Sequence, residues 1–152
     1  MDYNKLITPV QLKILNDTAE SNELESKSLE ELLPNGELRA VKGPRRPESW
    51  KEKNCFTVHI PSNPRDPDTK THNGTMRINH YCPNYNDGNA NVELMGPISN
   101  RLLILFDDWW PNISGYEVAN WAVEEPLGPL HDPEAPEEHY TSIKIDFFIR
   151  KL

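Results

Sequence analysis

The sequence has 152 residues and a formal net charge of −8 at pH 7. This acidic balance argues against a general nucleic-acid binder, because such proteins neutralise phosphates with Lys and Arg. The length is that of one domain able to fold without disulfides or metal, and the two cysteines, Cys55 and Cys82, are too few for a disulfide framework. No apolar run approaches the roughly 20 residues that span a bilayer, and the first residues do not resemble a signal peptide. We therefore expect a soluble protein, without membrane contact, made in a reducing cytoplasm.

The charge is unevenly distributed along the chain. Residues 101–152 contain 4 Lys or Arg and 10 Asp or Glu, so this last third supplies −6 of the net −8. A surface built from it would repel polyanions such as DNA, although simple solubility explains an acidic surface equally well. A local basic stretch lies earlier in the chain and consists of Arg39, Lys42, Arg45, Arg46, Lys51 and Lys53.

Residues 1–54 are predicted to form an N-terminal helical and irregular arm. The Thr-Pro pair at 8–9 is a typical helix start, so a first helix is expected to run from there to about Asn16. A second helical segment is expected over 28–33, because Pro34 and Gly36 follow it. Residues 37–42 form a candidate short strand and 43–53 an irregular segment. One face of the first helix carries Leu6, Val10, Ile14 and Asp17.

Residues 55–152 are predicted to form the body of the protein, which begins with a hairpin. Apolar residues at 56, 58 and 60 alternate with polar ones and predict a strand. A second strand is expected over 75–82, with Met76, Ile78 and His80 on one face. The segment between them, 61–74, contains three prolines and ends in Asn73-Gly74, which predicts a long, extended hairpin loop.

Residues 91–108 carry the strongest helix pattern, because apolar side chains recur at spacings of three and four. Gly96-Pro97 would bend or break such a helix, so it begins either near Asn91 or only at Pro97. The Trp-Trp-Pro sequence at 109–111 ends it. A third body strand is predicted over 116–123.

A proline-punctuated acidic loop, 124–138, leads into a terminal strand over 140–151. In that strand Ile143, Ile145, Phe147 and Ile149 occupy alternate positions, the pattern of a strand with one buried face. The order of elements predicts a single-domain α+β fold. We expect an antiparallel or mixed sheet of about four strands with helices on one face, a long hairpin loop, and the C-terminal strand within the sheet.

Two sets of residues are candidates for chemistry. Cys55, His59, His80 and Cys82 would form a zinc-ligand set if the first two body strands brought them together, but zinc ligands usually come from closely spaced turn positions, so core residues are the favoured interpretation. A hydrolase would use His80, Asp87 or the Glu-Glu-His cluster at 137–139. The sequence contains no phosphate-binding glycine loop, nucleophile elbow or metalloprotease helix. We expect no enzyme, no catalytic residue, no cofactor and no metal.

Three features of residues 55–152 point to one known family. They are the order of elements, the apolar helix end Leu-Leu-Ile-Leu-Phe at 102–106, and the turn Gly-Pro-Leu-His-Asp-Pro at 128–133 before the strand His-Tyr-Thr-Ser-Ile-Lys-Ile-Asp-Phe at 139–147. Together they resemble the tail-terminator (tail-completion or neck) proteins of long-tailed bacteriophages. The first 54 residues have no counterpart in this resemblance.

The resemblance implies a structural virion protein that is not an enzyme. It implies a ring, a homohexamer, that caps the finished tail tube, contacts the tail tube protein and the head-side connector or stopper protein, and lets DNA pass without sequence-specific binding. Such a protein resides in the tail or neck of the virion and assembles in the host cytoplasm. The alternatives are another phage connector or baseplate structural protein, and a small cytoplasmic hydrolase.

Two long loops and an aromatic pair are the candidate interaction surfaces, since loops held by a rigid sheet often carry recognition and exposed aromatic side chains anchor interfaces. We expect segments 61–74 and 124–138 to contact neighbouring subunits or rings. One of the two adjacent tryptophans is expected to close the core, because neighbouring helix positions point about 100° apart. The candidate interaction residues are Arg65, Asp66, Lys70, His72, Trp109, Trp110, His131, Asp132, Glu134, Glu137 and Glu138.

Overall fold

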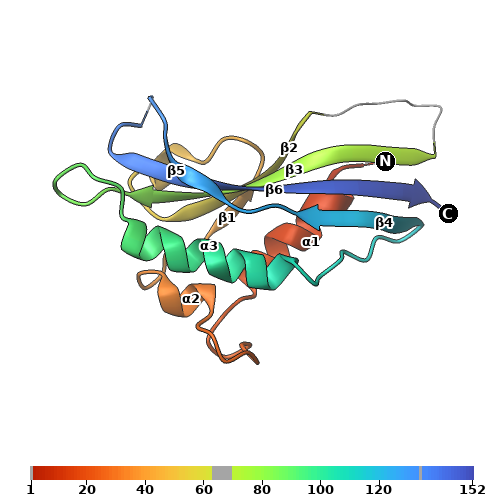
Figure 1. Ribbon diagram of the computed structural model, residues 1–152, viewed down its shortest axis with the longest axis horizontal. Helices are drawn as coiled ribbons and strands as arrows, with labels where there is room; N and C mark the ends of the chain where they lie inside the picture. The colour runs from red at the N-terminus through yellow and green to blue at the C-terminus, as the bar shows by residue number, and fades with distance from the viewer. Residues whose placement is uncertain (1, 63–69, 134) are drawn as a thin grey trace.

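The computed structural model describes residues 2–62, 70–133 and 135–152, which form a single α+β domain. Its helices are α1 (Asn4–Leu15), α2 (Leu29–Leu32) and α3 (Val92–Phe106), with a 3₁₀ turn at Glu48–Trp50. Its strands are β1 (Ala40–Lys42), β2 (Cys55–Ser62), β3 (Thr71–Pro83), β4 (Tyr116–Val123), β5 (Leu127–His131) and β6 (Glu138–Lys151). Figure 1 shows α1 and α3 on the same side of the sheet.

The strands form one mixed sheet in the order β1-β2-β3-β6-β4, and β5 also pairs with β6. β1 runs parallel to β2, and all other pairs are antiparallel. The longest ladder joins β3 to β6, from Thr71 opposite Arg150 to Pro83 opposite Glu138, so the C-terminal strand lies inside the sheet. β4 and β5 share the other edge of β6: β4 lies opposite 145–151, and β5 lies opposite 139–142.

The sheet has six strands, so the expected number of about four is wrong. The short strand β1 pairs with residues 56–58, and β5 lies within the segment 124–138 that was expected to be a loop. β5 forms because β4 covers only the end of β6, which leaves the first residues of that edge for Leu127, Leu130 and His131. Gly128 allows β5 to approach β6 closely, since a Cβ at position 128 would lie 3.0 Å from the carbonyl oxygen of Tyr140.

The hydrophobic core lies between the helices and one face of the sheet. The buried side chains of β6 are Ile143, Ile145, Phe147 and Ile149, which confirms the alternation predicted from the sequence. Met76 and Ile78 of β3 lie opposite Ile145 and Ile143 and are also buried. The helices cover this face with Leu6, Val10 and Ile14 of α1 and with Ile98, Leu102, Leu105 and Phe106 of α3. Residues from both parts of the chain, 1–54 and 55–152, therefore share one core.

Gly74 belongs to β3 and not to the turn that Asn73-Gly74 predicted. It lies opposite Phe147, and a Cβ at this position would lie 2.8 Å from the Cζ atom of the Phe147 ring. Glycine is therefore required here because an aromatic ring packs on bare backbone within the sheet. As a result β3 begins four residues earlier than expected, at Thr71.

The two long helices begin before their prolines. α1 starts at Asn4 and includes Pro9, which the sequence had predicted to open the helix. α3 starts at Val92, where the Asn91 side chain accepts a hydrogen bond from the Leu94 amide at 3.2 Å, and it continues through Pro97. In both helices, burial of the apolar side chains before and after the proline outweighs the loss of a backbone hydrogen bond. None of the described helices is long and apolar enough to cross a membrane.

Candidate functional site

A stretch of acidic residues without any cation lies along one edge of the sheet. Residues 102–143 contain nine of the 24 Asp and Glu residues and no Lys or Arg. Glu134 lies outside the described residues, and the other eight belong to β4, to the loops that flank β4 and β5, and to the start of β6. We call residues 107–133 and 135–138 the acidic edge. Its exposed carboxylates are those of Asp107, Asp108, Glu117, Glu124, Glu125 and Glu137.

Glu138 was a candidate contact residue, but it is buried at the start of β6 and the prediction that it is displayed is wrong. Its carboxylate accepts two hydrogen bonds from the Arg46 guanidinium, one of them 2.8 Å long, and a third from the Glu52 amide at 3.1 Å. The Arg46 guanidinium lies 4.1 Å from the centroid of the Tyr81 ring, which stacks on Tyr140. This ion pair holds the segment after β1 against the sheet face opposite the core.

The turn between β5 and β6 displays the remaining candidates of the acidic segment. His131 and Glu137 are exposed and Asp132 is half-buried. The rings of His131 and His139 lie 5.5 Å apart across the β5–β6 pair, and His139 is held by a hydrogen bond between its Nδ1 and the Asn84 side chain. The structure thus brings these residues to one end of the sheet, beside Glu138.

The two adjacent tryptophans have different environments. Trp109 is half-buried and packs edge-to-face on Phe106 and Trp121, with ring centroids 5.4 and 5.9 Å away. The Lys13 ammonium lies 5.7 Å from the Trp109 ring. Trp110 is 49% exposed, so it is the one of the pair that a partner can reach.

The described candidates from segment 61–74, Lys70 and His72, lie at the opposite end of the β3–β6 pair from that turn. Lys70 is exposed, and its carbonyl accepts a hydrogen bond from the Lys151 amide at 2.7 Å. His72 belongs to β3 and lies between the rings of Tyr3 and Tyr116, with centroids 6.4 and 6.1 Å away. Arg65 and Asp66 lie outside the described residues.

The four candidate zinc ligands do not converge. Phe56 lies opposite His80 in the β2–β3 ladder, so His80 and Cys82 point to the core face, whereas Cys55 and His59 point to the other face. No group of three or more metal-binding side chains occurs among the residues that the structure describes. Burial raises the pKa of the Cys55 thiol to about 11 and that of Cys82 to about 12, so both thiols are protonated at neutral pH.

The residues considered for a hydrolase are also separated. His80 is fully buried, stacks on Phe56 at 5.1 Å and shares a 2.9 Å hydrogen bond between its Nε2 and Asn54. Burial lowers the pKa of His80 to about 3, so the ring is neutral and inaccessible to a substrate. Asp87 is an exposed turn residue whose pKa is lowered by hydrogen bonds from the backbone and side chain of Asn89. These side chains do not form a catalytic cluster.

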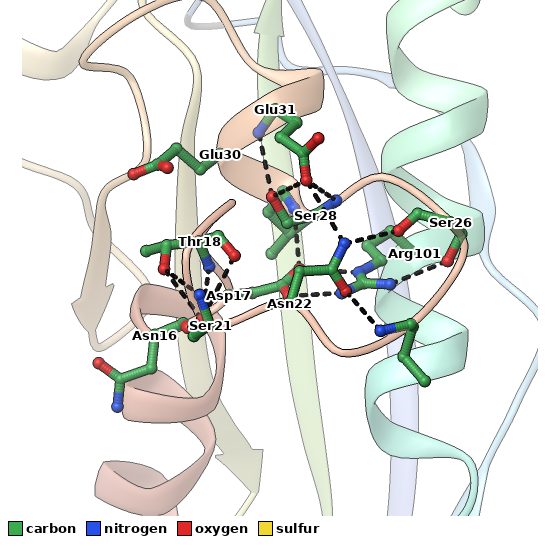
Figure 2. A network of polar contacts seen from close by, with 12 residues as sticks. Asn16, Asp17, Thr18, Ser21, Asn22, Ser26, Ser28, Glu30, Glu31 and Arg101 are labelled. Atoms are coloured by element: carbon green, nitrogen blue, oxygen red, sulfur yellow. Dashed lines mark hydrogen bonds and ion pairs between the residues drawn. The ribbon is translucent and has the colours of Figure 1, made fainter.

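A polar network between α1, α2 and α3 was not predicted (Figure 2). Arg101 of α3 is 2% exposed and donates from Nε and Nη2 to the two carboxylate oxygens of Asp17, at 2.8 and 2.6 Å. The same guanidinium donates to Ser26 Oγ at 2.9 Å and to Asn22 Oδ1 at 3.1 Å. The hydrogen bonds that Arg101 donates to Asp17, together with the negative charge of that carboxylate, raise the pKa of Arg101.

The network also orders the segment that follows α1. Asp17 accepts from the Leu29 amide at 2.8 Å, and Ser28 caps α2 in a reciprocal capping box with Glu31. The sequence carried one signal of this arrangement: Asp17 and Arg101 both occupy the apolar faces of their helical segments, where a charged side chain requires a partner.

Two comparisons with known proteins gave no match: no protein-family model matches the sequence, and no curated protein matches it either. The function must therefore be argued from the chain itself.

Proposed function

We propose that this protein is a structural virion component, a ring-forming tail terminator or neck protein that caps the phage tail tube and joins it to the head connector. The observation that carries the proposal is the place of segments 128–133 and 139–147 in the fold. The Gly-Pro-Leu-His-Asp-Pro sequence forms most of β5 and the following turn, and the strand sequence after it becomes part of β6 inside the sheet. The residues that carry the family resemblance therefore belong to α3, β5, the turn after it and β6 of one α+β domain.

The environment of the polar side chains supports a structural role. The buried charged residues are engaged with each other, as Asp17 with Arg101 and Glu138 with Arg46, and His80 is enclosed by the core. Groups used in this way hold elements together and are not available for a reaction. The exposed carboxylates of the acidic edge instead form an extended surface, the pattern of a protein that acts through its surface.

In the proposed ring, copies of this chain contact each other, the tail tube protein and the head-side connector. Carboxylates that face the passage would repel the DNA backbone, so that DNA moves through without adhering. The ring works without a cofactor and without sequence-specific DNA contacts. Its place is the tail or neck of the virion.

Imaging of virions tests the proposal. We expect density for this chain at the head–tail junction, arranged in a ring, and we expect particles made without it to have unjoined or abnormally long tails. Labelling a C-terminal peptide tag with gold-conjugated antibody gives an independent position. Normal joined tails in the absence of the protein, or label on the baseplate only, would overturn the proposal.

A further inference from the structure

The two outer edges of the sheet carry opposite charge. β4 is the last strand at one end, and β1 is the last strand at the other. The segment that contains β1, residues 39–53, has six Lys or Arg and two Asp or Glu. The acidic edge, which contains β4, has no Lys or Arg at all.

At the acidic end, β4 offers an open backbone edge. Within the described residues β4 pairs only with β6, and it contains neither proline nor lysine, the residues that commonly block edge strands. Its one irregularity is a register shift between Val118 and Asn120. Glu117 and Glu124 are engaged with Arg150 and Lys144 of β6, at 3.0 and 3.6 Å.

Three further carboxylates flank this edge without such pairing. Asp107, Asp108 and Glu125 are exposed and form no ion pair within the described part of the chain. Asp107 and Asp108 follow the end of α3 in the segment that leads to β4, and Glu125 lies two residues after β4, in a stretch without a single cation. Their mutual repulsion is relieved only by counter-ions or by a basic partner.

At the basic end, the groups that a partner can contact are charged side chains. The Ala40 carbonyl of β1 already accepts a hydrogen bond from the Gln11 side chain at 3.0 Å. Arg46 is used internally by Glu138. The exposed cations of this segment are Lys42, Arg45, Lys51 and Lys53.

We propose that the acidic edge of one copy docks against the basic segment 39–53 of the next copy, which would make the contact between neighbouring subunits of the proposed ring. This inference rests on the proposed function for the existence of the ring and adds which surfaces meet. The contact is head-to-tail, because its two sides are different patches at opposite ends of one sheet, and contacts of this kind form a ring when the rotation between neighbouring copies closes. A chain of net charge −8 repels its copies in other orientations, so the charge pattern also selects this one.

Charge reversal on purified protein tests the contact. Variant A carries Asp108→Lys and Glu125→Lys, and variant B carries Arg45→Glu and Lys53→Glu. All four side chains are exposed, so both variants should fold, which circular dichroism and the thermal midpoint verify. We expect each variant alone to self-associate about tenfold more weakly or worse than the wild type in analytical ultracentrifugation at low salt.

Mixing the two variants gives the decisive result. In an alternating assembly, the lysine-bearing edge of variant A meets the glutamate-bearing segment of variant B. The unaltered acidic edge of variant B meets the unaltered basic segment of variant A. The mixture should therefore recover assembly that neither variant shows alone. A matched control, Glu20→Lys with Glu25→Lys, reverses two exposed charges between α1 and α2 and should assemble like the wild type.

The outcomes separate this inference from the proposed function. Wild-type rings at the head–tail junction together with unimpaired assembly of variants A and B would overturn the contact and leave the function standing. Loss of DNA binding in variant B with unchanged assembly would also overturn it, since the basic segment would then be a nucleic-acid surface. Wild-type protein that stays monomeric at low salt refutes the contact, whereas the virion images decide the function independently.

Discussion

Two buried ion pairs fasten the first 54 residues to the rest of the chain, and they differ in the partners that each arginine holds. Asp17 and Arg101 lie on the helix side of the sheet with side chains 5% and 2% exposed, and Arg101 makes hydrogen bonds to three different side chains (Figure 2). Arg46 and Glu138 lie on the opposite side with side chains 7% and 1% exposed, and the Arg46 guanidinium binds Glu138 and packs on the Tyr81 ring. A pocket adjoins each pair, of about 510 Å³ beside Asp17 and Arg101 and of about 350 Å³ beside Arg46.

The difference sets how much is lost when one arginine is removed. Each carboxylate keeps a backbone amide donor, from Leu29 for Asp17 and from Glu52 for Glu138. Loss of Arg101 also leaves the Ser26 and Asn22 side chains without their donor. We therefore expect the pair on the helix side to contribute more to stability, and the other to be the more tolerant of change.

Removal of Arg101 should have the largest effect. Arg101→Met leaves the Asp17 carboxylate buried without a cation, and we expect a loss of about 3–5 kcal/mol in the free energy of unfolding, measured with urea. The double variant Asp17→Leu with Arg101→Met removes both charges and should recover part of that loss. A single variant as stable as the wild type would contradict a stabilising role for the Asp17–Arg101 network.

His80 differs from the two ion pairs because it is a buried titratable group without a charged partner. Its contribution to the free energy of unfolding therefore depends on pH. Its pKa is about 3 in the folded protein, below the ordinary value of 6.5, so between these values the unfolded chain binds more protons and stability falls as pH falls. At pH 4.5 this contribution amounts to about 2–3 kcal/mol relative to pH 7. His80→Gln, which can still hydrogen-bond Asn54, should reduce the difference in unfolding free energy between pH 7 and 4.5 by that amount. An unchanged difference would mean that His80 is protonated in the native state.

Removal of Arg46 should cost less than removal of Arg101. For Arg46→Met we expect a loss of about 2 kcal/mol, because the Glu138 carboxylate loses its cation but keeps the hydrogen bond from the Glu52 amide, and the change removes fewer side-chain hydrogen bonds than loss of Arg101. The exposed pair of Glu117 and Arg150, with both side chains 52% exposed, supplies the control: Glu117→Gln should change the unfolding free energy by less than about 0.5 kcal/mol. A cost for Arg46→Met equal to that of Arg101→Met would show that the additional hydrogen bonds of Arg101 add no stability.

The candidate contact residues show where sequence reasoning reached its limit. The acidic character of the last third and the unequal roles of the two tryptophans followed from composition and from helix geometry. Glu138 was misjudged because its partner, Arg46, lies 92 positions away in the chain, and no local pattern announces such a pair. Arg101 was overlooked for the same reason, since Asp17 lies 84 positions away.

The sequence by itself determined the α+β class, the positions of the long helices and strands, and the alternation that buries Ile143, Ile145, Phe147 and Ile149. These are local properties, set by the period of apolar residues along each segment. Only the tertiary structure decided that β5 completes the edge of β6, that β1 joins in parallel, and that Gly74 lies beneath the Phe147 ring. Each of these depends on a partner distant in sequence, whose surface becomes available only when the chain has folded.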